Sequence, residues 1–228
     1  MDPVATFVGF VVILSTQYAS NDTIGDVTGD ANKLVTELYA HGIENVVICN
    51  NGVSKNSIEN DAKNLANIAK EWQKKGYKVV VVGYSRGGSV ALYAQAIEGM
   101  NASGIVTMES PIMGAQDWVL WILGFDMMLQ GTKDMVKGSE SNNKLLEAIG
   151  NGSNLPPMLE ISGAVARTVA SKHAFNIFTP IGDNVFETWK PIHLGKGWLE
   201  PRAIDATAEF IHSLEEQSSG AIFFNPKE

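Results

Sequence analysis

The sequence predicts an α/β fold, a mostly parallel β-sheet with helices covering both of its faces. Short apolar runs alternate along the chain with longer segments whose apolar residues recur at helical spacing. The short runs are apolar at nearly every position, which is typical of strands buried on both faces of a parallel sheet. The 228 residues contain no internal repeat and no linker-like stretch, so we expect one domain over residues 1–228.

The predicted strands are short, continuous apolar runs. They span residues 7–14, 45–49, 77–83 and 104–109, with later candidates at 158–162 and 175–180. The first run, "FVGFVVIL", could also be taken for the core of a secretory leader. However, Asp2 is the only charge near it and no Ala-x-Ala site follows it, so a buried strand is the better interpretation. We therefore expect a cytoplasmic protein, with a leader already removed as the alternative.

The predicted helices show apolar stripes at helical spacing. They span residues 29–42, 57–76, 86–99 and 201–217. Gly42 is expected to stop the first of these helices, because glycine accepts the left-handed conformation common just after a helix end. Ser57 lies near the start of the second helix, and Lys74 and Lys75 occupy its last turn, where the helix dipole favours positive charge.

Composition and charge exclude several classes of partner. The net charge is −8, from 17 Lys+Arg against 25 Asp+Glu, so we expect no nucleic-acid partner. The single cysteine, Cys49, lies in the apolar run "NVVIC" and is predicted to be a buried core thiol. No Cys/His spacing of a zinc site is present, and we expect no metal. The apolar stretch 117–129 is interrupted by Asp126 and shorter than the ~20 residues of a membrane span, so stable membrane insertion is not expected.

The segment Gly83-Tyr84-Ser85-Arg86-Gly87 fits the pattern G-x-S-x-G and lies between a predicted strand and a predicted helix. This is the context of a nucleophile elbow, a strained turn that projects a serine Oγ from the carboxyl edge of the sheet. Positions beside the serine must then be nearly free of side chains. A phosphate-binding loop or a merely tight turn is the alternative, but Walker A and dinucleotide motifs need other spacings. The backbone N–H of Arg86, at the helix N-terminus, is predicted to be an oxyanion donor.

A serine nucleophile needs a base, and the chain offers four histidines. His41 lies at a predicted helix end and His212 within the last helix, and both are interpreted as structural. His193 lies in a loop just before the last helix, which agrees with the order Ser, acid, His expected of this type of site. His193 is therefore the predicted base, with a structural histidine as the alternative.

The acid is predicted to be Asp183, in "FTPIGDNVFE", because it lies between the serine and the predicted base. It is close in sequence to His193, which leaves little room for the helix and strand that usually intervene. Glu109, at the end of the fourth predicted strand, is the main competitor.

Residues 7 to about 110 and 180 to 215 resemble the α/β-hydrolase superfamily, most closely its small bacterial lipases and esterases. The segments that carry the resemblance are "VVVVGYSRGGSVALYA", "VTMESPIMG", "GDNVF" and "HLGKGWLEPRAIDATAEF". The resemblance implies a compact α/β-hydrolase fold with Ser85 as nucleophile, Asp183 as acid and His193 as base. It implies no cofactor.

One departure from the family concerns the loop after the first strand. Many members have His-Gly there, whereas this chain reads "ILSTQYAS". Thr16 and Gln17 fall at the position where the second oxyanion N–H should arise. A backbone donor does not require His-Gly, and of these two residues Gln17 is the predicted donor.

The segment 111–156 lies where this fold inserts a cap over the site. Within it, "DWVLWILGFDMML" is apolar on nearly every face of a helix. If it covers the site, Trp118 and Trp121 are substrate-binding residues and the substrate carries an apolar acyl group. Ordinary core packing of these tryptophans is the alternative.

The sequence therefore predicts a serine hydrolase that cleaves small-molecule carboxylic esters through an acyl-enzyme intermediate. A thioesterase, amidase or acyltransferase would use the same residues. A catalytically silent binding protein on a hydrolase scaffold is the alternative from a different class.

Overall fold

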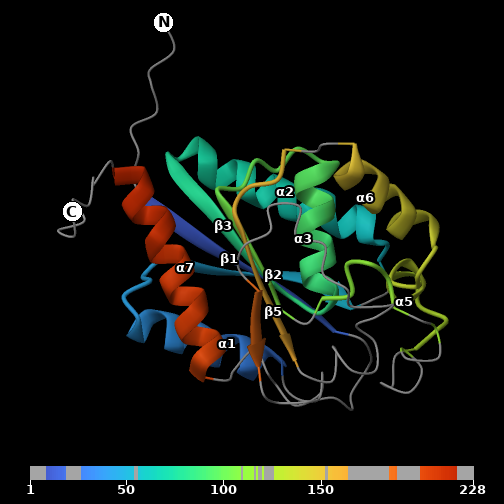
Figure 1. The fold of residues 1–228 in the computed structure, drawn as a ribbon, viewed down its shortest axis with the longest axis horizontal. Coiled ribbons are helices and arrows are strands. Elements are labelled where there is room, and N and C mark those ends of the chain that lie inside the picture. Colours follow the sequence, from blue (N-terminus) through green and yellow to red (C-terminus); the bar gives the residue numbers. More distant parts are fainter. Residues whose placement is uncertain are drawn as a thin grey trace, which may run out of the picture.

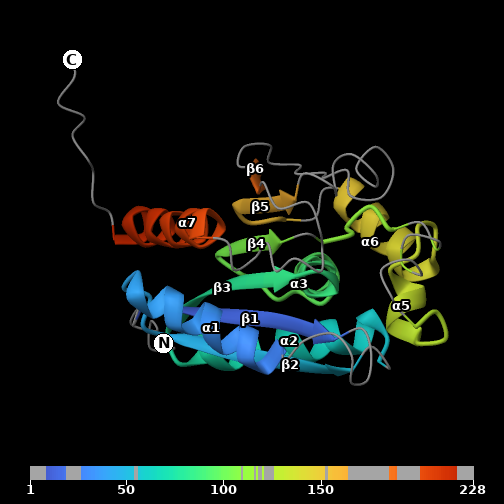
Figure 2. The ribbon, with the colours of Figure 1, turned by 90° about the horizontal axis from the view of Figure 1, so that it is seen from below.

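The structure is a computed structural model of the 228-residue chain. It describes residues 9–18, 27–53, 56–108, 110–115, 117, 120, 126–151, 154–163, 185–188 and 201–219. Helices lie on both sides of one central sheet (Figure 1). Seen from below, the strands lie one above another, from β2 at the bottom to β6 at the top (Figure 2).

Within the described residues the sheet has six strands in the order β2-β1-β3-β4-β5-β6, and every neighbouring pair is parallel. The strands are β1 (Gly9–Tyr18), β2 (Val46–Val53), β3 (Tyr77–Tyr84), β4 (Gly104–Met108), β5 (Met158–Gly163) and β6 (Val185–Thr188). Alternate side chains of β1, β3 and β4 enter two different core clusters, one on each face. This explains why their sequences are apolar without interruption, and it confirms the predicted fold class.

The helices form two layers. They are α1 (Val27–Ala40), α2 (Ile58–Lys74), α3 (Arg86–Ala96), α5 (Gln130–Asp134), α6 (Glu140–Gly150) and α7 (Pro201–Ser219). One core cluster joins α2, α3 and α6 to the sheet, with Leu65, Tyr93 and Leu145 among its members. The other joins α1 and α7 to the opposite face, with Leu38 and Phe210 among its members. The strands therefore lie between two apolar layers.

The predicted signals at helix ends are observed. Gly42 has φ +81° just beyond α1, and the amide of Ile43 reaches back to the carbonyl of Leu38 at 3.0 Å. The Ser57 hydroxyl accepts a hydrogen bond from the amide of Asn60 at 3.3 Å and so caps α2. Local chemistry thus sets these boundaries as the sequence indicated.

Cys49 is 2% exposed and forms no disulfide, which confirms it as a core thiol. Burial in apolar surroundings raises its pKa to about 12. A thiol this hard to ionise is a poor nucleophile at neutral pH.

Three elements were not predicted from the sequence, namely α5, α6 and β6. Leu145 and Ile149 of α6 belong to the same core cluster as α2 and α3, so this part of the segment 111–156 packs on the sheet's helix layer. The cap over the site stays a prediction. The candidate strand at 175–180 lies outside the described residues.

None of the helices in the described part of the chain combines the length and the apolarity that a membrane span requires.

Candidate active site

The turn between β3 and α3 places Ser85 in an unusual backbone conformation. Its φ is +53° and its ψ is −128°, a region that non-glycine residues rarely adopt. Such a residue costs on the order of 1–3 kcal/mol and persists only where its surroundings enforce it. The Ser85 amide donates to the carbonyl of Met108 on β4 at 2.8 Å, and the Ser85 carbonyl accepts from the amide of Gly88 at 3.1 Å. The turn is therefore held from both the sheet and the helix.

Three glycines surround Ser85 at positions where no side chain fits. A Cβ on Gly87 would collide with the carbonyl oxygen of Ser15 on β1, and a Cβ on Gly88 would collide with the hydroxyl of Ser110. A Cβ on Gly83 would lie 2.5 Å from the backbone of Gly88. The expectation that the positions around the serine must be small is thus confirmed. The start of α3 is wedged against the carboxyl edge of the sheet.

The register of the strands shows which residues of β1 and β4 lie beside the end of β3, just before Ser85. Gly83 pairs with Ser15 on β1 and with Thr107 on β4. Gln17 and Ser85 each lie two residues beyond the pair formed by Ser15 and Gly83, so their backbones reach the same edge of the sheet. The predicted role of the Gln17 amide is compatible with this register and stays a prediction.

The first turn of α3 presents the positive end of the helix dipole next to Ser85. Ser85 is the N-cap residue and its side chain makes no capping hydrogen bond to the helix. The backbone N–H of Arg86 begins the helix immediately after it. This arrangement favours a developing negative charge beside the serine hydroxyl.

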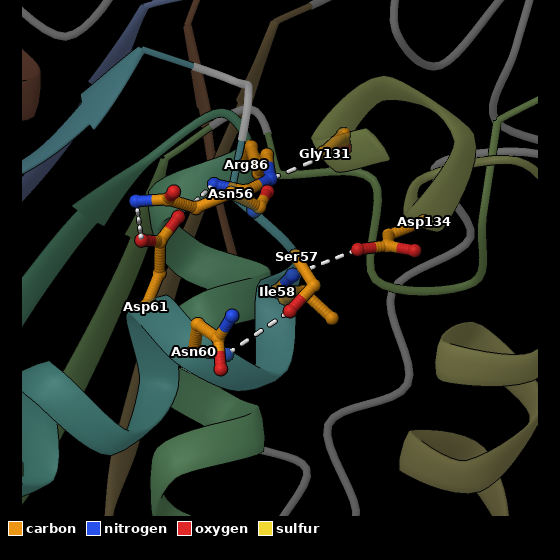
Figure 3. A network of polar contacts seen from close by, with 8 residues as sticks. All are labelled: Asn56, Ser57, Ile58, Asn60, Asp61, Arg86, Gly131 and Asp134. Carbon is orange, nitrogen blue, oxygen red and sulfur yellow. Dashed lines mark hydrogen bonds and ion pairs between the residues drawn. The ribbon is translucent and has the colours of Figure 1, made fainter. Parts of the chain in front are cut away.

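The side chain of Arg86 is buried, with 2% of its surface exposed, and each of its three guanidinium nitrogens donates a hydrogen bond (Figure 3). Nη1 forms an ion pair with Oδ2 of Asp61 at 2.6 Å. Nη2 donates to the carbonyl of Asn56 at 2.9 Å, and Nε donates to the carbonyl of Gly131 at 3.1 Å. The residue after the serine is thereby tied to α2 and to α5.

Burial disfavours the charged form of both members of this pair. It lowers the pKa of Arg86 and raises that of Asp61, while each charge favours the ionised state of the other. The side-chain amide of Asn56 donates to the second carboxylate oxygen of Asp61 at 3.2 Å. The pair is thus a buried, hydrogen-bonded unit, since a guanidinium stays protonated in proteins.

A second set of contacts joins α5 to the start of α2 (Figure 3). Oδ2 of Asp134, at the end of α5, accepts a hydrogen bond from the amide of Ile58 at 2.7 Å. Its other oxygen accepts from the side chain of Gln130 at 2.7 Å. The N-terminus of α2 is therefore satisfied partly by its own Ser57 and partly by a carboxylate distant in sequence.

A buried carboxyl group lies in the same row of the sheet. Glu160 on β5 pairs with Thr107 on β4, which in turn pairs with Gly83. Glu160 is 2% exposed and its Oε2 has no hydrogen-bond partner among the described residues. Burial raises its pKa to about 9, so the side chain is neutral at physiological pH.

Two of these groups were missed in the sequence, although each left a signal there. Asp61 is one turn after Ile58 and one turn before Leu65, so it falls on the apolar stripe of α2. Glu160 interrupts the apolar run "MLEIS". A charged residue at a position that the pattern assigns to the core indicates a buried polar contact.

The remaining predicted site residues are described only partly or not at all. Ser85 and Arg86 are described in full, and Gln17 as backbone within β1. The others lie outside the described residues, and they are Glu109, Trp118, Trp121, Asp183 and His193. In chain order Asp183 falls between β5 and β6, and His193 falls between β6 and α7.

No protein-family model and no curated protein matches this sequence. Solved structures do match. An esterase from Pyrobaculum calidifontis aligns over 94% of this chain and 78% of its own, with a TM-score of 0.59 and 16% identity. A monoacylglycerol lipase from Paleococcus ferrophilus aligns over 90% of this chain and 96% of its own, with a TM-score of 0.57 and 15% identity.

The chain spans only 40% of the length of the phospholipase PlaB from Legionella pneumophila, which aligns over 70% of this chain at a TM-score of 0.48 and 13% identity. The esterase and the monoacylglycerol lipase, which align over most of this chain and of their own, have the α/β-hydrolase fold. This chain therefore has the α/β-hydrolase fold as well, which confirms the fold that the resemblance implied.

Proposed function

We propose that this protein is a serine hydrolase that cleaves carboxylic esters through an acyl-enzyme intermediate. The observation that carries the proposal is the conformation of Ser85, at φ +53°, where β3 meets α3. Strain of this kind at a polar residue is a feature of functional sites. That an esterase and a lipase share the fold supports the choice of ester chemistry.

In the proposed reaction His193 takes the proton of the Ser85 hydroxyl as its Oγ attacks the ester carbonyl. Asp183 holds the imidazole in the required tautomer and stabilises its charged form. The backbone N–H groups of Arg86 and Gln17 hold the oxyanion, and His193 then protonates the departing alcohol. Water, activated by the same histidine, releases the carboxylic acid and restores Ser85. No cofactor is required.

The substrate is proposed to carry an apolar acyl chain, because of the tryptophans in the segment 117–129. Each methylene buried by Trp118 and Trp121 would contribute about 0.8 kcal/mol. Medium-chain esters are then better substrates than acetate esters. Replacing both tryptophans by Ala should flatten this dependence while hydrolysis of acetate persists. Equal losses on all esters, with a lower Tm, would instead identify the tryptophans as core residues.

The nucleophile is tested with Ser85→Ala, using p-nitrophenyl esters and a fluorophosphonate probe. We expect loss of labelling and a fall in kcat of at least about a thousandfold. Ser89→Ala is the matched control, because this buried serine of α3 has an Oγ without a hydrogen-bond partner among the described residues. The Ser89 variant should retain activity. Unchanged turnover in a clean Ser85→Ala preparation would refute the proposal.

The acid is tested by comparing Asp183→Asn with Glu109→Gln. If Asp183 orients His193, its replacement should lower kcat strongly with little change in KM. The Glu109 variant should then behave like wild type. The reverse result would transfer the role of the acid to the residue that follows β4.

A further inference from the structure

We propose that Asp61 is a positioning residue for the reaction assigned to Ser85. It acts through the side chain of Arg86, and so fixes the peptide between Ser85 and Arg86 that carries one oxyanion donor. The inference rests on the proposed function and adds a residue that lies on a different helix, α2.

Arg86 connects three separate segments at one point (Figure 3). Its guanidinium contacts Asp61 and Asn56 at the start of α2, and Gly131 within α5. Both members of the ion pair are buried, at 2% and 4% side-chain exposure. A guanidinium with partners on several sides has little freedom to rotate, so its own Cα and amide are held as well.

The backbone at this point needs such support. Ser85 has a positive φ and the next residue starts α3, so relaxation of the turn would rotate the peptide between them. The glycines at 83, 87 and 88 only remove obstacles to the conformation, because glycine itself is flexible. On the sheet side, the Ser85 amide is fixed by its hydrogen bond to the carbonyl of Met108. On the helix side, the Arg86 side chain is fixed by its contact with Asp61.

Stability alone does not account for a buried ion pair. Removing two charges from water is costly, and well-packed apolar residues of similar volume are often as stabilising or more so. What an ion pair with fixed hydrogen bonds adds is orientation. The pair lies directly beside the strained serine, where orientation matters for the proposed chemistry.

The test uses variants that weaken or replace the ion pair between Asp61 and Arg86 but leave every backbone amide in place. Asp61→Asn and Arg86→Lys each weaken the ion pair. The double variant Asp61→Leu with Arg86→Met replaces it by apolar side chains that can restore stability. Tyr93→Phe is the matched control. Tyr93 is two turns after Arg86 on α3, and its hydroxyl donates to Glu59 of α2 at 2.7 Å, so it also joins these two helices.

For each variant the readouts are kcat, KM, the rate of fluorophosphonate labelling and the Tm, with kinetics measured well below that Tm. We expect kcat and the labelling rate to fall about tenfold to a hundredfold in the single variants, with KM nearly constant. The double variant should recover Tm without recovering kcat. Tyr93→Phe should lower Tm and leave kcat unchanged.

The outcomes separate the two proposals. Wild-type protein that neither hydrolyses esters nor reacts with the probe would remove the proposed function, and this inference with it. Wild-type protein that reacts while the double variant reacts equally fast would overturn the positioning role alone. A kcat that falls only in proportion to Tm across all variants, Tyr93→Phe included, would also overturn the positioning role.

Discussion

The two faces of the sheet are built differently. On the side of α2 and α3 the buried residues include charged and polar side chains, among them Asp61, Arg86 and Glu160. On the side of α1 and α7, within the described part of the chain, the buried polar side chain is Thr207, whose hydroxyl donates to a carbonyl of its own helix. The layer of α2 and α3 therefore combines an apolar cluster with buried polar contacts near the strained turn, whereas the layer of α1 and α7 is almost wholly apolar where the structure describes it.

This difference shows where the fold accepts an energetic cost. Unpaired or charged groups in a core are destabilising, so they concentrate where geometry matters more than stability. Ser85 lies at the start of α3, on the polar side, and α1 and α7 contribute no described residue to its turn. The comparison predicts that equal substitutions on the two faces have unequal effects.

The largest expected effect comes from adding one methyl group on each face. In Gly87→Ala the new Cβ meets the backbone of Ser15, which cannot move away, and we expect a loss of about 3 kcal/mol or more. In Gly104→Ala it meets the side chain of Leu214 on α7, which can rotate, and we expect about 1 kcal/mol. Urea unfolding of both variants measures the difference. Equal losses would show that the two faces are equally rigid.

An intermediate effect is expected from Glu160→Gln. Burial raises the Glu160 pKa to about 9, so between its ordinary pKa and about 9 the carboxyl ionises in the unfolded chain but stays protonated in the folded one. Its contribution therefore becomes less favourable as the pH rises through that interval. Removing the acid should stabilise the protein by about 1–3 kcal/mol at neutral pH.

The measurement is the Tm of wild type and Glu160→Gln as a function of pH. The gain should grow with pH until about 9 and vanish in acid, where the carboxyl is protonated in both states. Glu209→Gln, at an exposed position on α7, is the control and should show no such trend. A gain independent of pH would mean that Glu160 is ionised in the folded protein.

The smallest effect is expected on the opposite face, where two histidines join α1 to α7. Nδ1 of His41 lies 2.7 Å from the carbonyl of Glu37, and its Nε2 lies 2.9 Å from Asp205. Nε2 of His212 lies 2.8 Å from the carbonyl of His41, and its Nδ1 lies 3.0 Å from Glu215. Each ring faces two acceptors, and only the protonated imidazole can donate to both.

These contacts raise the pKa of both rings. The main cause is the carbonyl of Glu37 for His41 and the carboxylate of Glu215 for His212. Their stabilisation is complete below the ordinary histidine pKa and is lost as the pH rises through the raised value. Because both rings are partly exposed, we expect about 1 kcal/mol or less in total.

Thermal unfolding at about pH 6 and about pH 8 tests this histidine contact. From about pH 6 to about pH 8 the Tm of wild type should fall further than the Tm of the double variant His41→Gln with His212→Gln. Glu160 is present in both proteins, so its contribution cancels in this comparison. Ester hydrolysis by the double variant should match that of wild type at both pH values. A parallel loss of Tm in the two proteins would mean that folding does not raise the pKa of either ring.

Much of this architecture could be predicted because the signals are local. Continuous apolar runs identified β1 to β5, and the pattern G-x-S-x-G with its flanking strand and helix identified the conformation of Ser85. The contact between Asp61 and Arg86 could not be predicted, because it depends on how α2 and α3 pack. The short α5 and β6 lack the length for a periodic signal, and the Asn-rich start of α6 obscured its later apolar residues.

The contacts that hold the turn at Ser85 have a consequence for biosynthesis. They come from residues between Ser15 on β1 and Gly131 on α5. A chain is made from its N-terminus and begins to fold as it emerges. The strained turn can therefore be in place while Asp183 and His193 have yet to be translated, so a growing chain acquires the proposed nucleophile before the groups proposed to activate it.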